Sequence, residues 1–131
     1  MFNLQVRVYL EDTDAGGIVF YANYLKFMER ARSEFLRSLG IGVKDLPAQD
    51  IQFVVRDLQI DYRRPARLGD ELQVSAQVIE QGPASLIFRQ DVIHQEVLLC
   101  TARVRLACLR ASTLKPRALP DFFNCLSVLE P

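Results

Sequence analysis

The chain contains a single stretch with the periodicity of an amphipathic helix, and most of the sequence beyond it alternates with the period of a β-strand. Between residues 23 and 39, apolar side chains recur on one face while charged side chains fall on the other. Asn23 is a suitable N-cap, and Gly40 suits the C′ position just beyond a helix. The apolar positions are Tyr24, Met28, Ala31, Phe35 and Leu39. We therefore predict one long helix around which the fold is built.

Alternation of apolar and polar residues predicts strands both before and after this helix. The alternating segments span residues 6–10, 57–62, 72–78, 85–93 and 100–108, with turns expected at 65–69, 81–83 and 95–96. Small side chains on one face of the last strand, Cys100, Ala102 and Cys108, would let a helix that carries Met28 and Phe35 approach closely. We expect an α+β fold, in which an antiparallel sheet of about five strands wraps one long central helix.

The composition is that of one ordinary globular domain covering residues 1–131. The 16 basic and 16 acidic side chains cancel, and without a block of Lys or Arg a nucleic-acid partner is not expected. Charges interrupt the apolar runs at the amino terminus, so we expect a cytoplasmic protein without a signal peptide or a membrane span. Cys100, Cys108 and Cys125 lack CxxC spacing and His94 is the only histidine, so packed thiols and no metal are expected.

The segment between the first strand and the helix, residues 11–17, combines three carboxylates with two glycines. One interpretation is a solvated acidic turn whose charges complement the helix dipole. The other is a catalytic loop: glycines let the backbone approach a ligand, the helix N-terminus donates N–H groups to a developing negative charge, and a carboxylate attacks or activates water. This second arrangement would suit acyl transfer to water, and the residues alone leave both interpretations open.

A serine–histidine dyad is a weaker candidate. Ser85 and His94 belong to one extended strand and would lie about 30 Å apart, so they cannot form a dyad within one chain. His94 stands beside a hairpin turn and is expected to be a solvated turn residue.

A long segment of the chain resembles a known family. The stretch from Arg7 to Arg32, RVYLEDTDAGGIVFYANYLKFMERAR, is similar to the signature of hotdog-fold thioesterases of the 4-hydroxybenzoyl-CoA type. The segments FVVR, DYRRPARLGD and KPRALP extend the resemblance over nearly the whole chain, most closely to the acyl-CoA thioesterases associated with the bacterial Tol-Pal system. It implies a single hotdog domain, with Asp14 as the catalytic carboxylate and the backbone amide of Tyr21 polarising the thioester carbonyl. Many Tol-Pal-associated members carry histidine at the position of Tyr21, so the acyl pocket is expected to differ.

The resemblance also implies where substrate binds and how the chain assembles. A serine after the 82–83 turn resembles the position where family members contact the coenzyme, although it would also be an ordinary serine at the start of a strand. Apart from the resemblance, the charge of Arg63, Arg64 and Arg67 around Pro65 would suit coenzyme phosphates, although exposed arginines near a turn also have ordinary solvated roles. The family's sites are built by dimers, and a lone hotdog sheet leaves an exposed edge, so we expect a dimer or a dimer of dimers, a homotetramer. The expected substrate contacts are Gly17, Ile18, Val19, Tyr24, Arg63, Arg67 and Ser85.

From these residues and this resemblance we predict hydrolysis of an acyl-CoA, or of an acyl carrier protein thioester, to a free acid and a thiol, with no cofactor. Asp14 would be the nucleophile or the general base for water, and both roles remain open. One alternative is a non-catalytic acyl-CoA-binding or envelope-associated scaffold protein on the same fold. Another is a hotdog dehydratase, which ordinarily needs a histidine in its site.

Overall fold

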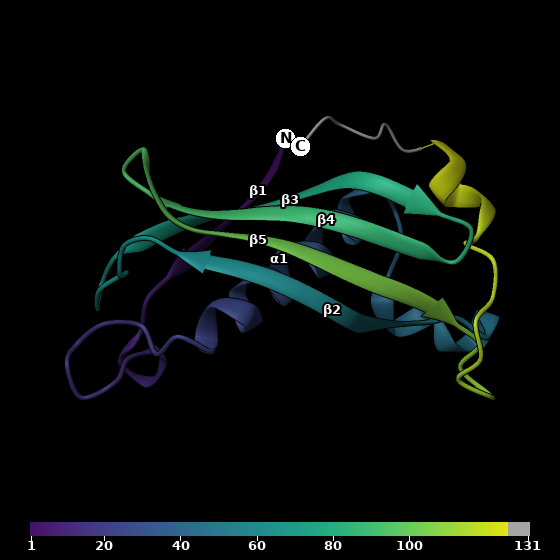
Figure 1. The fold of residues 1–131 in the computed structure, drawn as a ribbon, viewed down its shortest axis with the longest axis horizontal. Helices are drawn as coiled ribbons and strands as arrows, with labels where there is room; N and C mark the ends of the chain where they lie inside the picture. The colour runs from purple at the N-terminus through teal and green to yellow at the C-terminus, as the bar shows by residue number, and fades with distance from the viewer. Residues whose placement is uncertain (126–131) are drawn as a thin grey trace.

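The computed structural model describes the backbone of residues 1–125 and the side chains of residues 1–123. It contains one five-stranded antiparallel sheet with a long helix against one face (Figure 1), so the expected α+β hotdog fold is confirmed. The end of the expected 1–131 domain and the side chain of Cys125 lie outside the described residues. The strands are β1 (Phe2–Arg7), β2 (Gln52–Tyr62), β3 (Glu71–Gly82), β4 (Ser85–His94) and β5 (Val97–Leu109). The long helix is α1 (Asn23–Ser38), and the short 3-10 helices are η1 (Leu10–Asp12), η2 (Val43–Asp45), η3 (Pro47–Gln49) and η4 (Asp121–Cys125).

The strands are ordered β1-β3-β4-β5-β2, and every neighbouring pair is antiparallel. The turn at 95–96 joins β4 to β5 as expected, whereas β3 joins β4 through residues 83–84, because residues 81 and 82 of the expected 81–83 turn still pair with β4. Gln95 and Glu96 have φ angles of 47° and 68°, which is the backbone of the two-residue turn that matches the twist of a β-hairpin. The edges of the sheet are β1 and β2.

The buried face of α1 and the inward side chains of the strands form one hydrophobic cluster. Phe27, Met28 and Ala31 are at most 1% exposed, and Tyr24 is 3% exposed, so this face is fully covered. The helix ends at Gly40 as predicted: its φ is 85°, and its N–H donates to the Arg37 carbonyl at 2.9 Å. A second bond from the next residue back to the last turn completes a Schellman motif.

Several predicted boundaries were wrong, and β3 and β5 are also longer than the predicted segments, with β3 ending at Gly82 and β5 beginning at Val97. The first strand runs from Phe2 to Arg7 rather than over 6–10, because these residues pair with β3 and the chain then turns into η1. β2 begins at Gln52, earlier than predicted, since its pairing with β5 continues past a register shift after Val55. Asn23 is not the N-cap, because Ala22 occupies that position.

The helix lies beneath β1 and β3 rather than beneath the last strand. The ring of Phe35 packs edge-on against Phe2 and Phe88, with centroid distances of 6.0 and 5.8 Å. Cys100 and Ala102 join the main cluster, but Cys108 packs in a separate one, so its expected contact with the helix was wrong. This position of the helix leaves the β2 side of the sheet open.

Candidate active site

Hydrogen bonds to Asp12 fold the loop between β1 and α1. The Asp12 carboxylate accepts the backbone N–H of Tyr9 at 2.9 Å, which closes η1. The Asp12 carbonyl accepts the N–H of Phe20 at 3.0 Å and the side-chain amide of Asn23 at 2.9 Å. Asp12 therefore ties the start of the loop to the start of the helix, and its role is structural.

Asp14 lies at a tight turn of the same loop, with its carboxylate exposed. Its backbone N–H donates to the Ile18 carbonyl at 2.9 Å, and its carboxylate accepts the N–H of Gly16 at 2.8 Å. A Cβ at position 16 would come within 3.3 Å of that carboxylate, and Gly17 has a φ of 78°, so both glycines suit the turn. In the described part of the chain, no cationic side chain forms an ion pair with Asp14. A fixed and accessible carboxylate is the result.

The second half of this loop is anchored on the turn that precedes β3. The N–H of Val19 donates to the Ala66 carbonyl at 2.9 Å, and the N–H of Leu68 donates to the Gly17 carbonyl at 3.2 Å. The Tyr24 hydroxyl accepts the N–H of Ala66 at 3.0 Å, inside the core. Of the expected substrate contacts, Val19 and Tyr24 are thus buried residues that hold the two loops together, Val19 through its backbone N–H and Tyr24 through its hydroxyl, while Gly17 and Ile18 are half-buried.

Tyr21 stands just before α1, and its side chain is 65% exposed. Its carbonyl accepts a hydrogen bond from the Tyr62 hydroxyl at 2.8 Å, so its peptide unit is held from the end of β2. Burial raises the pKa of Tyr62, and the hydroxyl is therefore a donor throughout the neutral range. Among the described residues, no acceptor is hydrogen-bonded to the Tyr21 N–H. An N–H group that lies just before a helix and has no partner can bind a developing negative charge.

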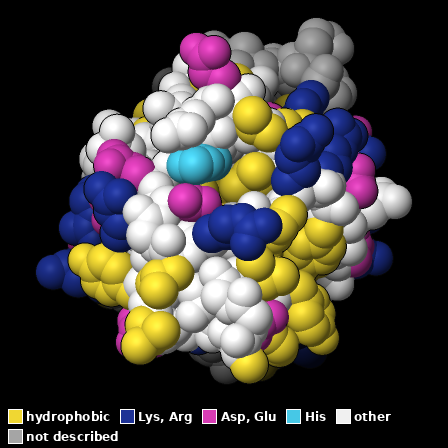
Figure 2. Space-filling view, turned by 90° about the vertical axis from the view of Figure 1, so that its left-hand side faces the viewer, with side chains coloured by type: hydrophobic (Ala, Val, Ile, Leu, Met, Phe, Trp, Pro, Cys, Tyr) yellow, Lys and Arg dark blue, Asp and Glu magenta, His cyan; other side chains and the backbone are white. Residues whose placement is uncertain are grey.

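Charged side chains surround the loop end of the molecule (Figure 2). Arg63 is paired with Asp61 at 3.1 Å, and Arg67 lines an open hollow of about 310 Å³ together with His94. His94 ends β4 directly before the hairpin turn, where it is half-buried and lies 3.6 Å from Asp70. Arg63 and Arg67 both lie in the connection between β2 and β3, which is hydrogen-bonded to the loop that carries Asp14.

Ser85 lies at the opposite end of the sheet from Asp14. It begins β4, whereas His94 ends the same strand beside the 66–70 turn, about 30 Å away for an extended strand. The structure therefore brings Asp14, Tyr21 and Arg67 to one end of the chain and leaves Ser85 at the other.

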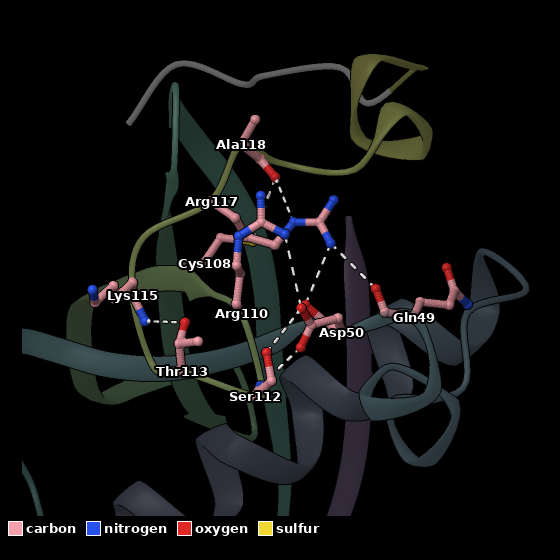
Figure 3. A network of polar contacts seen from close by, with 9 residues as sticks. All are labelled: Gln49, Asp50, Cys108, Arg110, Ser112, Thr113, Lys115, Arg117 and Ala118. Atoms are coloured by element: carbon pink, nitrogen blue, oxygen red, sulfur yellow. Dashed lines mark hydrogen bonds and ion pairs between the residues drawn. The ribbon is translucent and has the colours of Figure 1, made fainter.

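A cluster of basic residues that the sequence analysis did not single out lies at the Ser85 end (Figure 3). Asp50 accepts two hydrogen bonds from Ser112, at 2.8 and 3.1 Å, which hold its pKa below the ordinary value. Arg117 donates to the Asp50 carbonyl at 3.3 Å, and Arg110 lies 3.8 Å from the Asp50 carboxylate. Lys115 follows in the same loop, which returns to the 83–84 turn through backbone hydrogen bonds. Lys115 and Arg117 are visible in the sequence as part of the KPRALP segment. This segment is far from Ser85 in the sequence, so the sequence does not show that the two lie close together.

Two further observations limit the chemistry that the site can use. Cys100 and Cys108 are buried, and burial raises the pKa of Cys100 to about 12, so this thiol is not a nucleophile at neutral pH. Among the described residues there is no group of three His, Cys, Asp or Glu side chains that could hold a metal ion.

No helix of the described part is long and apolar enough to cross a membrane.

Comparisons with known proteins agree with the family that residues 7–32 resemble. The chain matches the family model described as "Thioesterase superfamily" over residues 16–101. It is 43% identical over 121 residues to the acyl-CoA thioester hydrolase YbgC of Escherichia coli O6:H1, which covers 92% of this chain and 90% of that protein. It is 44% identical over 120 residues to the acyl-CoA thioesterase YbgC of Haemophilus influenzae, which covers 91% of this chain and 88% of that protein. A crystal structure of a probable thioesterase from Bartonella henselae superposes with a TM-score of 0.85 at 38% identity, over 90% of this chain and 98% of that one.

The anchoring role of Tyr24 can be tested by Tyr24→Phe. Removal of the hydroxyl leaves the N–H of the buried residue Ala66 without its acceptor, so the free energy of unfolding should fall by about 1–3 kcal/mol. Chemical denaturation measures the loss, and hydrogen exchange should accelerate at the amides of Val19 and Ala66. Tyr21→Phe is the matched control, because that side chain is exposed and should change the stability by only about 0.5 kcal/mol or less. Equal losses for the two variants would contradict the role of Tyr24.

Proposed function

The chain belongs to the thioesterase superfamily, and on this premise we propose that it hydrolyses acyl-CoA thioesters with Asp14 as its catalytic carboxylate. The observation that carries the proposal is the joint position of Asp14 and the Tyr21 amide. Both belong to one short segment before α1, whose conformation is fixed by hydrogen bonds to Asp12, Ala66 and Tyr62. A carboxylate and an N–H donor are the two groups that hydrolysis of a thioester requires.

In this mechanism, the oxygen of water forms a bond to the acyl carbon and the carbon–sulfur bond breaks. Asp14 either takes the proton from the attacking water, or attacks first to form an anhydride that water then opens. The N–H of Tyr21 stabilises the negative charge on the carbonyl oxygen. The leaving thiolate receives the proton that the water gives up. Burial of Cys100 and Cys108 supports a carboxylate rather than a thiol as the reactive group.

The proposal includes a physiological setting. Acyl carrier protein thioesters are a second substrate class, because they present the same kind of acyl–sulfur bond. We place the enzyme in the cytoplasm, in association with the Tol-Pal system, as the resemblance of the FVVR, DYRRPARLGD and KPRALP segments implies. Arg63, Arg67 and Ser85 would bind the coenzyme moiety, with Lys115 and Arg117 adding positive charge near Ser85.

A homo-oligomer is part of the same proposal, because it would unite groups that lie apart in one chain. β2 is an edge strand of 11 residues that exposes Val55 and Leu58, as a strand that pairs with another chain does. Antiparallel pairing of two β2 strands would bring the Ser85 end of one copy toward the Tyr21 end of the other, because Gln52 and Tyr62 mark these two ends of the strand. We propose a dimer, paired further into a tetramer.

The role of the Tyr21 backbone can be tested by a pair of substitutions, assayed by thiol release from a panel of acyl-CoAs. Tyr21→Phe keeps the N–H, so kcat should stay within about tenfold of the parent value. Tyr21→Pro removes the N–H, and kcat should fall by about 10²–10³-fold. Equally severe losses would implicate the phenol instead of the amide. Absence of thiol release from every acyl-CoA by the parent protein would overturn the proposed function.

The oligomer can be tested by sedimentation at micromolar protein concentration. We expect the parent chain to sediment as a dimer or tetramer. Leu58→Lys, which places a charge on the exposed edge of β2, should shift it toward the monomer and lower activity in parallel. Leu114→Lys, at an exposed turn, is the control. A parent protein that is a fully active monomer would contradict this part of the proposal.

A further inference from the structure

A groove of about 460 Å³ lies between the second half of α1 and the first half of β2. It exists because α1 lies beneath β1 and β3, which leaves the β2 side of the sheet uncovered. Its lining is mostly apolar and includes Leu36, Val43, Leu46, Ile51, Phe53 and Phe88. An apolar groove of this size suits an extended hydrocarbon chain.

Both α1 and β2 connect the Tyr21 end of the molecule to the groove. The end of β2 holds the Tyr21 carbonyl through Tyr62, and β2 runs back from there along the open side of α1 to Gln52 at the groove. Arg32 follows the first residue of the helix by nine positions, which places it about 14 Å further along the helix axis. An acyl chain whose thioester lies at the Tyr21 amide would have to extend along the helix by about this distance to bring its far end to Arg32.

Arg32 is a cationic side chain in this apolar lining, and among the residues that the structure describes it forms no ion pair with an acidic side chain. Its guanidinium donates one hydrogen bond, to the Gln90 side chain at 2.9 Å. Within the described residues no carboxylate lies within 4.0 Å of it. Glu29, one turn earlier, lines the outer part of the groove, but it is exposed to water and lies 3.4 Å from the hydroxyl of Ser33.

The position of Arg32 is set by the buried amide of Gln90. Gln90 is 0% exposed, and its side-chain nitrogen donates to the carbonyls of Met28 at 2.9 Å and Ser75 at 3.0 Å. The Ser75 carbonyl is available because the ladder between β3 and β4 is interrupted there, where the Ser75 hydroxyl accepts the N–H of Asp91. With both donors occupied, the Gln90 oxygen faces Arg32 and holds one end of the guanidinium. Burial lowers the pKa of Arg32, partly offset by the negative charge of Glu29, yet a guanidinium remains charged.

An unpaired cation in an apolar groove is unfavourable unless a ligand supplies the opposite charge. A methyl-terminated chain would exclude water from Arg32 and offer it no acceptor. A carboxylate would accept two hydrogen bonds from the remaining N–H groups, which is the geometry that a guanidinium fork prefers.

We propose that the groove binds the acyl chain of the substrate and that Arg32 is a specificity-determining residue, which binds a carboxylate at the far end of that chain. The substrates of the enzyme would then include monothioesters of dicarboxylic acids, ω-carboxyacyl-CoAs. This inference rests on the proposed function, since it assigns the acyl end of the same thioester.

The test compares kcat/KM for matched pairs of substrates: adipyl-, suberyl- and sebacyl-CoA against hexanoyl-, octanoyl- and decanoyl-CoA. The parent enzyme should favour the carboxylated member at one chain length or more by at least about tenfold, the range of a hydrogen bond to a charged group. Arg32→Met and Arg32→Gln should each lower this ratio by about tenfold or more, mainly by loss of the carboxylated substrate. Arg32→Gln keeps a donor for Gln90 and is therefore the milder change to the fold. Arg30→Met, on an exposed part of the helix outside the groove, should leave the ratio unchanged.

The outcomes distinguish the role of Arg32 from the thioesterase function. Hydrolysis of both series by the parent enzyme at rates within about threefold of one another would overturn the role of Arg32 while leaving the thioesterase function intact. The same conclusion follows if the Arg32 variants lose activity equally on both series, or if their loss accompanies dissociation of the oligomer. Absence of hydrolysis of every substrate would overturn the proposed function itself. The parent ratio decides the inference even if neither Arg32 variant folds.

Discussion

The structure depends on a mismatch in width between one helix and a five-stranded sheet. A helix with its side chains is about 10–12 Å across, whereas five strands spaced about 4.8 Å apart span roughly 19 Å. α1 covers β1 and β3 with its apolar face, so the β2 side remains open. The groove that contains Arg32 and the exposed edge of β2 both follow from this position. The features that we assign to substrate binding and to assembly therefore have one physical cause.

The start of the helix is held at its place by two tyrosines. Tyr24 accepts the N–H of Ala66 inside the core, and Tyr62 donates to the carbonyl of Tyr21 at the surface. Burial raises the pKa of Tyr62, so its hydroxyl keeps the proton that it donates to Tyr21, whereas Tyr24 is the acceptor of its bond and needs no proton for it. The loop that carries Asp14 is joined to this pair through Val19, whose N–H donates to Ala66. The distance between the carboxylate and the Tyr21 amide is thus determined by the core rather than by the loop alone.

Much of this could be predicted from the sequence, and the parts that could not have identifiable reasons. Gly40 at the C′ position of the helix and the hairpin turn at 95–96 were predicted correctly, because local backbone chemistry determines them. The start of the first strand was not, because its pairing with β3 is set by residues nearly seventy positions away. Asn23 is of a residue type that favours the N-cap position. Its side-chain amide instead donates a hydrogen bond to the Asp12 carbonyl, a contact that no local rule indicates.

The candidate site shows the same difference between features set by neighbouring residues and features set by distant contacts. The carboxylates and glycines of residues 11–17 indicated a candidate loop, the resemblance assigned roles to Asp14 and Tyr21, and these two residues belong to one continuous segment. Arg32 and Gln90 lie 58 residues apart, so their contact appears only in the folded chain. The burial of Tyr24, expected at first to touch substrate, likewise depends on the distant Ala66.

The central claim is that the Asp14 carboxylate performs the chemistry, and a comparison of Asp14→Asn with Glu11→Gln tests it most directly. Each substitution replaces one carboxylate of the same loop by an amide of nearly equal shape, and Glu11 is exposed. With the melting temperature and substrate affinity measured alongside, Asp14→Asn should bind acyl-CoA normally while kcat falls by at least about 10²-fold, and Glu11→Gln should stay near the parent rate. A folded Asp14→Asn enzyme that hydrolyses its best substrate within about threefold of the parent rate would contradict the account.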